Sequence, residues 1–112
     1  MAAGNYDIVI DQGADFSIEL VIAQNGEAVN LASHTASAQL RPTPTSSTLT
    51  ATFTCQVTDA AEGKLTMNLG YALTRNIASG KYYYDLELFN SSANSITRLI
   101  QGVARVTAEV TR

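Results

Sequence analysis

The chain has 112 residues, of which 46% are hydrophobic and 15% are charged, and its formal net charge is -3. This length fits a single domain with one hydrophobic core, which needs neither a metal nor disulfide bonds to fold. The composition argues against disorder, and the seven scattered basic residues argue against direct binding of nucleic acid.

The first predicted elements are two strands joined by a turn. Alternation of apolar residues over 6–10 predicts a strand that ends at 11–14, where Gly13 can supply a positive φ angle. From Asp15 to Ile22 the apolar residues again occupy every second position, which predicts a second strand. The Asn25-Gly26 pair suits a tight type I′ hairpin turn, and a short return strand is expected over 29–31.

The middle of the chain continues as strands. Residues 35–41 form a strand with small residues on one face, and this strand ends at Pro42. Because the segment 42–47 lacks two backbone donors, we expect it to be an exposed loop between sheets. A strand over 49–57 and a turn over 59–63 follow, and the inward positions of the next strand are Leu65, Met67 and Leu69.

Residues 70–80 break the alternation and predict one or two helical turns closed by Gly80. A long hairpin follows, whose first arm places four residues on its buried face: Tyr82, Tyr84, Leu86 and Leu88. In the second arm, a bulge near Gln101-Gly102 would bring three residues inward: Val106, Ala108 and Val110.

Seven or eight short strands separated by turn signals predict an all-β protein with one helical turn. We expect an immunoglobulin-like antiparallel β-sandwich spanning residues 1–112, with a small barrel as the alternative.

The residues that carry chemistry are too few to form a catalytic or metal site. His34 is the sole histidine and lies in a predicted turn, and Cys55 is the sole cysteine, at an apolar position of a strand. A zinc or copper site needs several such ligands, so we predict no metal, cofactor or catalytic residue. Asp7, Asp11 and Asp15 recur every fourth residue, but the strand and turn assignments place them apart.

Two surface features remain as candidates for binding. Alternation points Tyr83 outward, where it can contact a protein partner, whereas a sugar-binding platform of tyrosines is the alternative. Asp85 and Glu87 share the outer face and can pair with Arg98. Arg98 and Arg105 point to opposite faces unless a bulge intervenes, so a basic patch with Arg112 is not expected.

Several segments resemble small virion proteins of tailed bacteriophages and prophages, which are encoded among tail and fibre genes. The resemblance covers nearly the whole chain, although Ala108 stands where a proline is frequent. Its motifs are Ile10-Asp-Gln-Gly-Ala-Asp-Phe16, Leu40-Arg-Pro42, Gly80-Lys-Tyr-Tyr-Tyr-Asp-Leu-Glu-Leu88, Thr97-Arg-Leu-Ile-Gln-Gly-Val103 and Ala108-Glu-Val-Thr-Arg112.

The resemblance implies an immunoglobulin-like structural protein without enzymatic activity, located at the tail, baseplate or neck, where it attaches or adapts tail fibres. Its partners would be other virion proteins, including further copies of itself, and not a membrane. The N-terminus lacks the features of a secretion signal, so we expect synthesis in the host cytoplasm and residence in the virion. The alternatives are a capsid decoration protein and a carbohydrate-binding module for the host surface. Candidate interface residues are Tyr83, Pro42, Pro44, Arg105 and Arg112.

Overall fold

The structure is a computed structural model that describes residues 4–111. These residues form strands and one helical turn: β1 (Gly4–Asn5), β2 (Ile8–Asp11), β3 (Phe16–Val21), β4 (Ala23–Gln24), β5 (Glu27–Ala28), β6 (His34–Arg41), β7 (Ala51–Asp59), β8 (Lys64–Leu69), α1 (Tyr71–Thr74), β9 (Gly80–Asn90) and β10 (Ser95–Thr107). In this part of the chain, the one helical turn is far too short to span a membrane.

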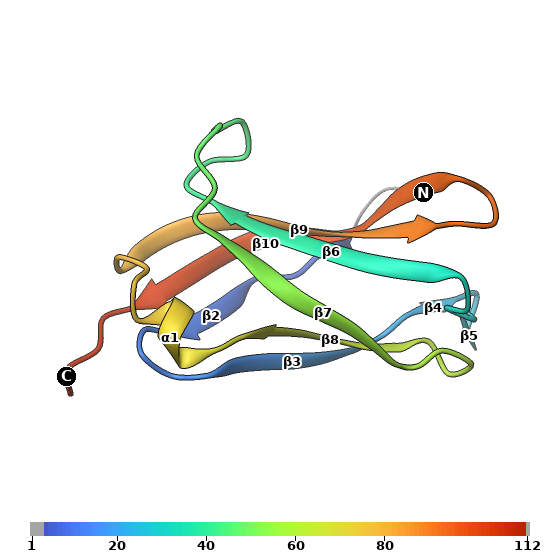
Figure 1. The fold of residues 1–112 in the computed structure, drawn as a ribbon, viewed down its shortest axis with the longest axis horizontal. Helices are drawn as coiled ribbons and strands as arrows, with labels where there is room; N and C mark the ends of the chain where they lie inside the picture. Colours follow the sequence, from blue (N-terminus) through green and yellow to red (C-terminus); the bar gives the residue numbers. More distant parts are fainter. Residues whose placement is uncertain (1–3, 112) are drawn as a thin grey trace.

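The strands form a curled sheet whose two halves face each other as the layers of a sandwich (Figure 1). The hydrogen-bonded order is β1-β10-β9-β6-β7-β8-β3, and β2 also pairs with β10. β7 connects the layers, because Ala51 to Phe53 pair with β6 whereas Thr54 to Asp59 pair with β8. The layers are therefore β2-β10-β9-β6 and β7-β8-β3. This arrangement is the predicted immunoglobulin-like β-sandwich with one short helical turn.

The N-terminal strands differ from the purely antiparallel prediction. β1 and β2 run parallel to β10, with Gly4 opposite Ile100 and Ile8 opposite Ala104. Parallel pairing is possible because these strands lie far apart in the sequence and no hairpin constrains their directions. The segment between them approaches β10 closely at Gly102, where an added Cβ would lie 2.3 Å from the carbonyl oxygen of Tyr6.

The core lies between the layers and confirms the predicted facing of the central strands. Its apolar side chains come from both layers: Ile8, Ile10, Leu31, Ala38, Leu40, Phe53, Leu65, Met67, Leu69, Ile77, Tyr84, Leu86, Leu88, Ala104 and Val106. Phe53 links the layers, because its ring contacts those of Phe16 and Tyr84 edge-on at centroid distances of 6.0 and 6.2 Å. The hydroxyl of Tyr84 donates a hydrogen bond to the carbonyl oxygen of Tyr6.

The predicted turns are confirmed at two positions. Gly13 has a φ of 85°, and in the β4–β5 hairpin Asn25 and Gly26 have φ angles of 54° and 80°. Both residues of a type I′ turn require positive φ, which explains the Asn-Gly pair. Gly63 also has a positive φ of 69°, and a Cβ there would lie 2.5 Å from the carbonyl oxygen of Ile22.

The predicted helical segment has one turn, within the one or two expected, but the assignment of Gly80 as its stop is wrong. α1 ends at Thr74, and Gly80 begins β9. Tertiary contacts end the helix early: the buried Thr74 hydroxyl accepts a hydrogen bond from Gly13 N (3.1 Å) and donates one to Ala14 O (2.8 Å). Shortly afterwards Ile77 enters the core, so the chain cannot continue as a surface helix.

The last strand also differs from the prediction. The register shift lies between Arg98 and Ile100, not at 101–102. Ala104 and Val106 are buried, but Ala108 and Val110 are exposed because β10 ends at Thr107. Beyond this end, the backbone N–H of Glu109 donates a hydrogen bond to Gln12 Oε1 (2.9 Å). This contact directs the chain away from the sheet.

The loop after Pro42 joins the neighbouring strands β6 and β7, which pair with each other, and does not lie between separate sheets. β7 begins at Ala51, two residues later than predicted, and Leu49 in the loop is exposed. Thr50 N donates to Leu40 O (2.9 Å), so hydrogen bonding between the two strand ends closes the base of the loop.

Candidate functional site

The outer face of β6, β9 and β10 carries polar side chains in rows that cross the three strands. Asp85 of β9 lies between Gln39 of β6 and Gln101 of β10, and Tyr83 lies between Arg41 and Val103. Successive side chains of a strand alternate between faces, so the intervening residues of β9 fill the core. The regular sheet therefore holds this set of donors and acceptors in fixed relative positions.

The bulge at Leu99 determines which residues of β10 face outward. Before the bulge Arg98 lies opposite Glu87, and after it Gln101 lies opposite Asp85. Without the bulge Arg98 and Arg105 would face opposite sides of the strand. With it they share the outer face, although Arg105 lies further along the strand, opposite Lys81.

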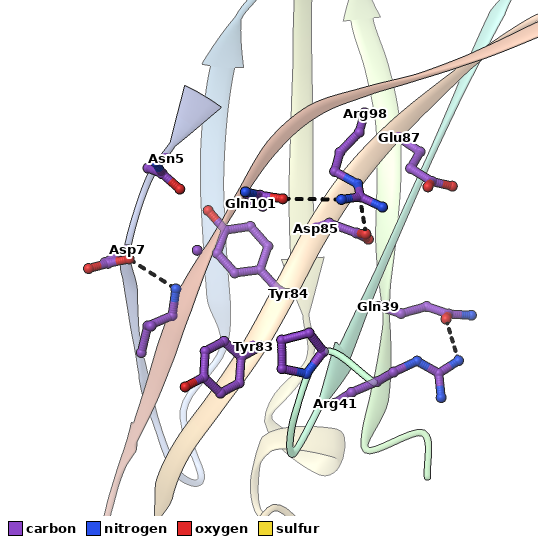
Figure 2. Close-up of a pocket in the computed structure, with 13 residues that line it drawn as sticks. Asn5, Asp7, Gln39, Arg41, Tyr83, Tyr84, Asp85, Glu87, Arg98 and Gln101 are labelled. Carbon is purple, nitrogen blue, oxygen red and sulfur yellow. Dashed lines mark hydrogen bonds and ion pairs between the residues drawn. The ribbon is translucent and has the colours of Figure 1, made fainter. Parts of the chain in front are cut away.

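The rows form the floor of a groove with a volume of about 640 Å³ (Figure 2). One side of the groove is formed by Asn5 and Asp7 of the N-terminal segment, which follows the edge of β10. The other side is formed by Arg41 at the end of β6 and by Pro44 in the loop. This volume lies within the range of binding sites for small ligands or short segments of polymer.

Hydrogen bonds fix the polar side chains of the groove. Arg98 Nε lies 3.4 Å from Asp85 Oδ2, and its Nη1 donates to Gln101 Oε1 (3.2 Å). On the other side Arg41 Nη2 donates to Gln39 Oε1 (2.9 Å). Figure 2 shows both pairs beside the floor of the groove.

The charge of the groove is nearly balanced. Three carboxylates line it, those of Asp7, Asp85 and Glu87, against the guanidinium groups of Arg41 and Arg98. Among the described residues, no side chain forms an ion pair with Glu87. The groove therefore does not concentrate positive charge for an anionic ligand, and its hydrogen-bonding groups suit a neutral or mixed-charge surface.

The predicted interface residues are only partly brought together. Tyr83 and Pro44 both line the groove, and Lys81 Nζ lies 5.4 Å from the centroid of the Tyr83 ring. Pro42 is half-buried at the start of the loop and does not line the groove. Arg105 is exposed on the same face, outside the groove, and Arg112 lies outside the described residues.

Sequence reasoning missed most of the groove. Alternation along residues 35–41 assigns Gln39 and Arg41 to the outer face, but the pattern of a strand does not reveal its neighbours in the sheet. The register between β6, β9 and β10 was needed to bring Gln39, Asp85 and Gln101 together. The predicted pairing of Asp85 with Arg98 is confirmed, because a hairpin does fix its own register.

The aspartates at every fourth position have separate structural contacts. Asp7 Oδ1 accepts a hydrogen bond from Val103 N (2.9 Å), Asp11 Oδ1 from the Thr107 hydroxyl (2.9 Å) and Asp15 Oδ1 from Tyr71 N (2.7 Å). Within residues 4–111 no three groups of the metal-binding types lie close enough together to hold an ion.

Cys55 and His34 also lie outside the groove. Cys55 is half-buried against the core, and burial raises the pKa of its thiol from 9.0 to about 11. The raised pKa disfavours the reactive thiolate, which agrees with the prediction that Cys55 occupies an apolar position and is not a nucleophile. His34 is the first residue of β6 and not part of a turn, and its Nδ1 lies 2.9 Å from Ala32 O.

No protein-family model and no curated protein matches this sequence. Among solved structures, CopC from Methylosinus trichosporium OB3b superposes with a TM-score of 0.51 at 13% identity, over 100% of this chain and 90% of CopC. Looser superpositions are found with InlP of Listeria monocytogenes (TM-score 0.44, 13% identity, 96% of this chain and 28% of InlP). A family 123 glycoside hydrolase from Clostridium perfringens gives a TM-score of 0.47 at 15% identity, over 97% and 24% of the two chains. The likeness to CopC shows the sandwich fold and nothing about activity.

Proposed function

We propose that this chain is a structural protein of a bacteriophage virion, without enzymatic activity, that attaches or adapts tail fibres at the tail, baseplate or neck. The observation that carries this proposal is the resemblance of its motifs, along nearly the whole chain, to small tail-associated virion proteins. The fold is compatible with such a role, because two-layer β-domains can dock neighbours through sheet faces, edges and end loops.

The motif at residues 10–16 supports the proposal because several of its residues form hydrogen bonds that join distant segments of the chain. Gln12 donates to Ile77 O (2.7 Å) and accepts from Glu109 N (2.9 Å), so one side chain joins two distant segments. Asp15 accepts from the first backbone N–H of α1, and Gly13 takes the positive φ of the turn. These residues stabilise the fold, which is the role expected of a motif in a structural protein.

The outer face offers a surface for a partner. Tyr83 and Pro44 contribute an aromatic ring and a rigid apolar ring to the groove, and the side chains of Arg98 and Asp85 are partly exposed beside them. Aromatic residues and arginine are enriched in protein interfaces. A fibre or baseplate subunit can therefore bind this face without any change in the core of the domain.

The experiment is to locate the chain in purified particles. A tagged copy is expressed in a host that produces the phage, and the particles are purified and imaged by electron cryo-microscopy. The proposal expects density for the chain at the tail, and Tyr83→Ala should reduce its incorporation several-fold. Gln56→Ala, an exposed position on β7, serves as the control. Density on the capsid shell would support the decoration-protein alternative, and absence from the particles would contradict both.

One observation favours a second candidate, a carbohydrate-binding module. The groove combines an aromatic ring with amides and carboxylates at fixed positions, and its charge is nearly balanced. Such groups can stack on a sugar ring and bind its hydroxyls. Binding of the isolated domain to neutral oligosaccharides on a glycan array, lost in Tyr83→Ala and kept in Gln56→Ala, would support this function. An array without binding would remove it.

A further inference from the structure

In an immunoglobulin-like sandwich the second strand usually lies between two neighbours, because the first strand pairs with it in the same layer. Here β3 takes the position of the second strand and pairs with β8. The N-terminal strands β1 and β2 instead pair with β10 in the opposite layer. Among the described residues no strand pairs with the second edge of β3, which runs along the lower boundary of the molecule in Figure 1.

The core is less well covered along this edge. The inward residues of β3 are only half-buried, whereas the β8 residues directly opposite them are 0–1% exposed. The opposed pairs are Phe16 and Leu69, Ile18 and Met67, and Leu20 and Leu65. Neighbouring strands of one layer thus differ in burial because β8 has a strand on both sides and β3 on one.

A cavity lined by both apolar and polar residues opens between the layers where β3 ends. Its volume is about 440 Å³, and its apolar lining includes Ile22 and Val29, which follow β3 and β5, and Leu99 and Ile100 of β10. The cavity also touches the first half of β10, which β1 leaves uncovered because their pairing begins at Ile100. Apolar side chains of a strand laid against β3 would have space to enter here.

The edge lacks most of the usual features that prevent strand addition. β3 contains neither proline nor lysine, and its register with β8 continues without a bulge from Phe16 to Val21. Natural edge strands are commonly protected by such features, because unpaired backbone groups can template another chain. Glu19 is the one charged residue of the strand, and it faces outward.

We propose that the free edge of β3 captures an extended segment of a partner polypeptide by strand addition. This inference rests on the proposed function, because it takes the partner to be another virion protein. The segment would carry apolar residues at every second position. Their side chains would point into the space between the two layers, beside Ile18 and Leu20. On the other face it would carry a lysine or arginine next to Glu19, since opposite charges on adjacent strands attract.

The test is selection of short random peptides displayed on a library against the isolated protein. We expect enrichment of peptides with alternating apolar residues and a basic residue on the polar face. In hydrogen exchange, the best synthetic peptide should slow the exchange of backbone amides in β3. Enriched peptides without alternation, no enrichment, or protection confined to β9 would overturn the proposal.

A charge reversal sharpens the test. Glu19→Lys should weaken the basic peptide at least about fivefold and favour a peptide with an acidic residue at that place. Glu62→Lys is the matched control, because it reverses the same charge in the exposed turn between β7 and β8, where it lines neither the groove nor the cavity, and it should leave peptide binding unchanged. Equal effects of the two variants would contradict binding at β3. Because the selection uses the isolated protein, its failure leaves the location of the chain in a particle to be decided independently.

Discussion

The two layers of the sandwich are closed to different degrees. In the layer β2-β10-β9-β6, β1 and β2 cover the second half of the edge of β10, and β7 covers the other end at β6. In the layer β7-β8-β3, the last strand has a partner on one side only. A single N-terminal segment can cover one edge, and placing it on β10 leaves β3 free.

Specific contacts explain why the N-terminal segment follows β10. The carboxylate of Asp7 accepts a hydrogen bond from Val103 N, and Asp11 accepts one from the Thr107 hydroxyl. Directly before Asp7, the carbonyl oxygen of Tyr6 accepts a hydrogen bond from the hydroxyl of Tyr84, and Gly102 allows the close approach. These contacts favour the β10 edge over the β3 edge, so the asymmetry of the sandwich is encoded in the chain.

The largest expected effect comes from placing a charge in the closed layer. Leu86 is fully buried, so Leu86→Asp introduces a carboxylate with no partner and should abolish soluble, folded expression. Tyr84→Asp should do the same. Ser17→Asp, at an exposed position of β3, should remain soluble with a normal β-sheet circular dichroism spectrum. Normal folding of Leu86→Asp would show that the facing of β9 is wrong.

A matched pair of truncations compares the two layers directly. Leu86→Ala should lower the free energy of unfolding by about 2 to 5 kcal/mol, because it leaves a cavity in a closed core. Leu20→Ala removes the same atoms from the half-buried edge strand and should cost about 1 kcal/mol. Urea denaturation measures both values. Equal losses would mean that the β3 edge is as well packed as β9.

The pKa of the Cys55 thiol tests how well the layer β7-β8-β3 is buried. Burial raises this pKa from 9.0 to about 11, so at a pH below 9 alkylation of the folded protein should be about a hundredfold slower than that of an unfolded control. The folded state holds the proton more tightly, so the contribution of Cys55 to stability is present below pH 9. It is lost as the pH rises towards 11. Cys55→Val should remove this part of the alkaline destabilisation, and an unchanged pH profile would contradict the assignment.

The smallest effect is expected at the surface ion pair. Arg98→Ala should lower the free energy of unfolding by less than about 1 kcal/mol, because Arg98 and Asp85 are both partly exposed. A double-mutant cycle with Asp85→Ala, measured at low and high salt, should give a coupling that decreases as salt is added. A coupling independent of salt would indicate that water and ions reach the Arg98–Asp85 pair less than the exposure of these side chains implies.

The local features of the fold were predictable from the sequence, because they depend on neighbouring residues. Alternation assigned the inward faces of β8 and β9, and Gly13 and Asn25-Gly26 marked the turns between β2 and β3 and between β4 and β5. The predictions failed where distant contacts decide the outcome. Thr74 binds the turn at Gly13 and ends the helix well before Gly80.

The candidate site was less predictable than the fold. Tyr83 and Pro44 were identified individually, but their common groove depends on β6 and β9 being neighbours and on the bulge at Leu99. The free edge of β3 was equally unpredictable from the sequence, because it results from the parallel pairing of β2 with β10. Period-two patterns report which face of a strand is buried and not which strand lies beside it.

The most direct test of the asymmetry between the layers is hydrogen exchange of the backbone amides in the isolated domain and, under the proposed function, in purified phage particles. In the isolated domain we expect the amides of β9 to be strongly protected and those on the free edge of β3 to exchange rapidly. In particles the β3 amides should become protected as a partner strand covers them. Strong protection of every β3 amide in the isolated domain, or unchanged exchange in the particle, would contradict the account.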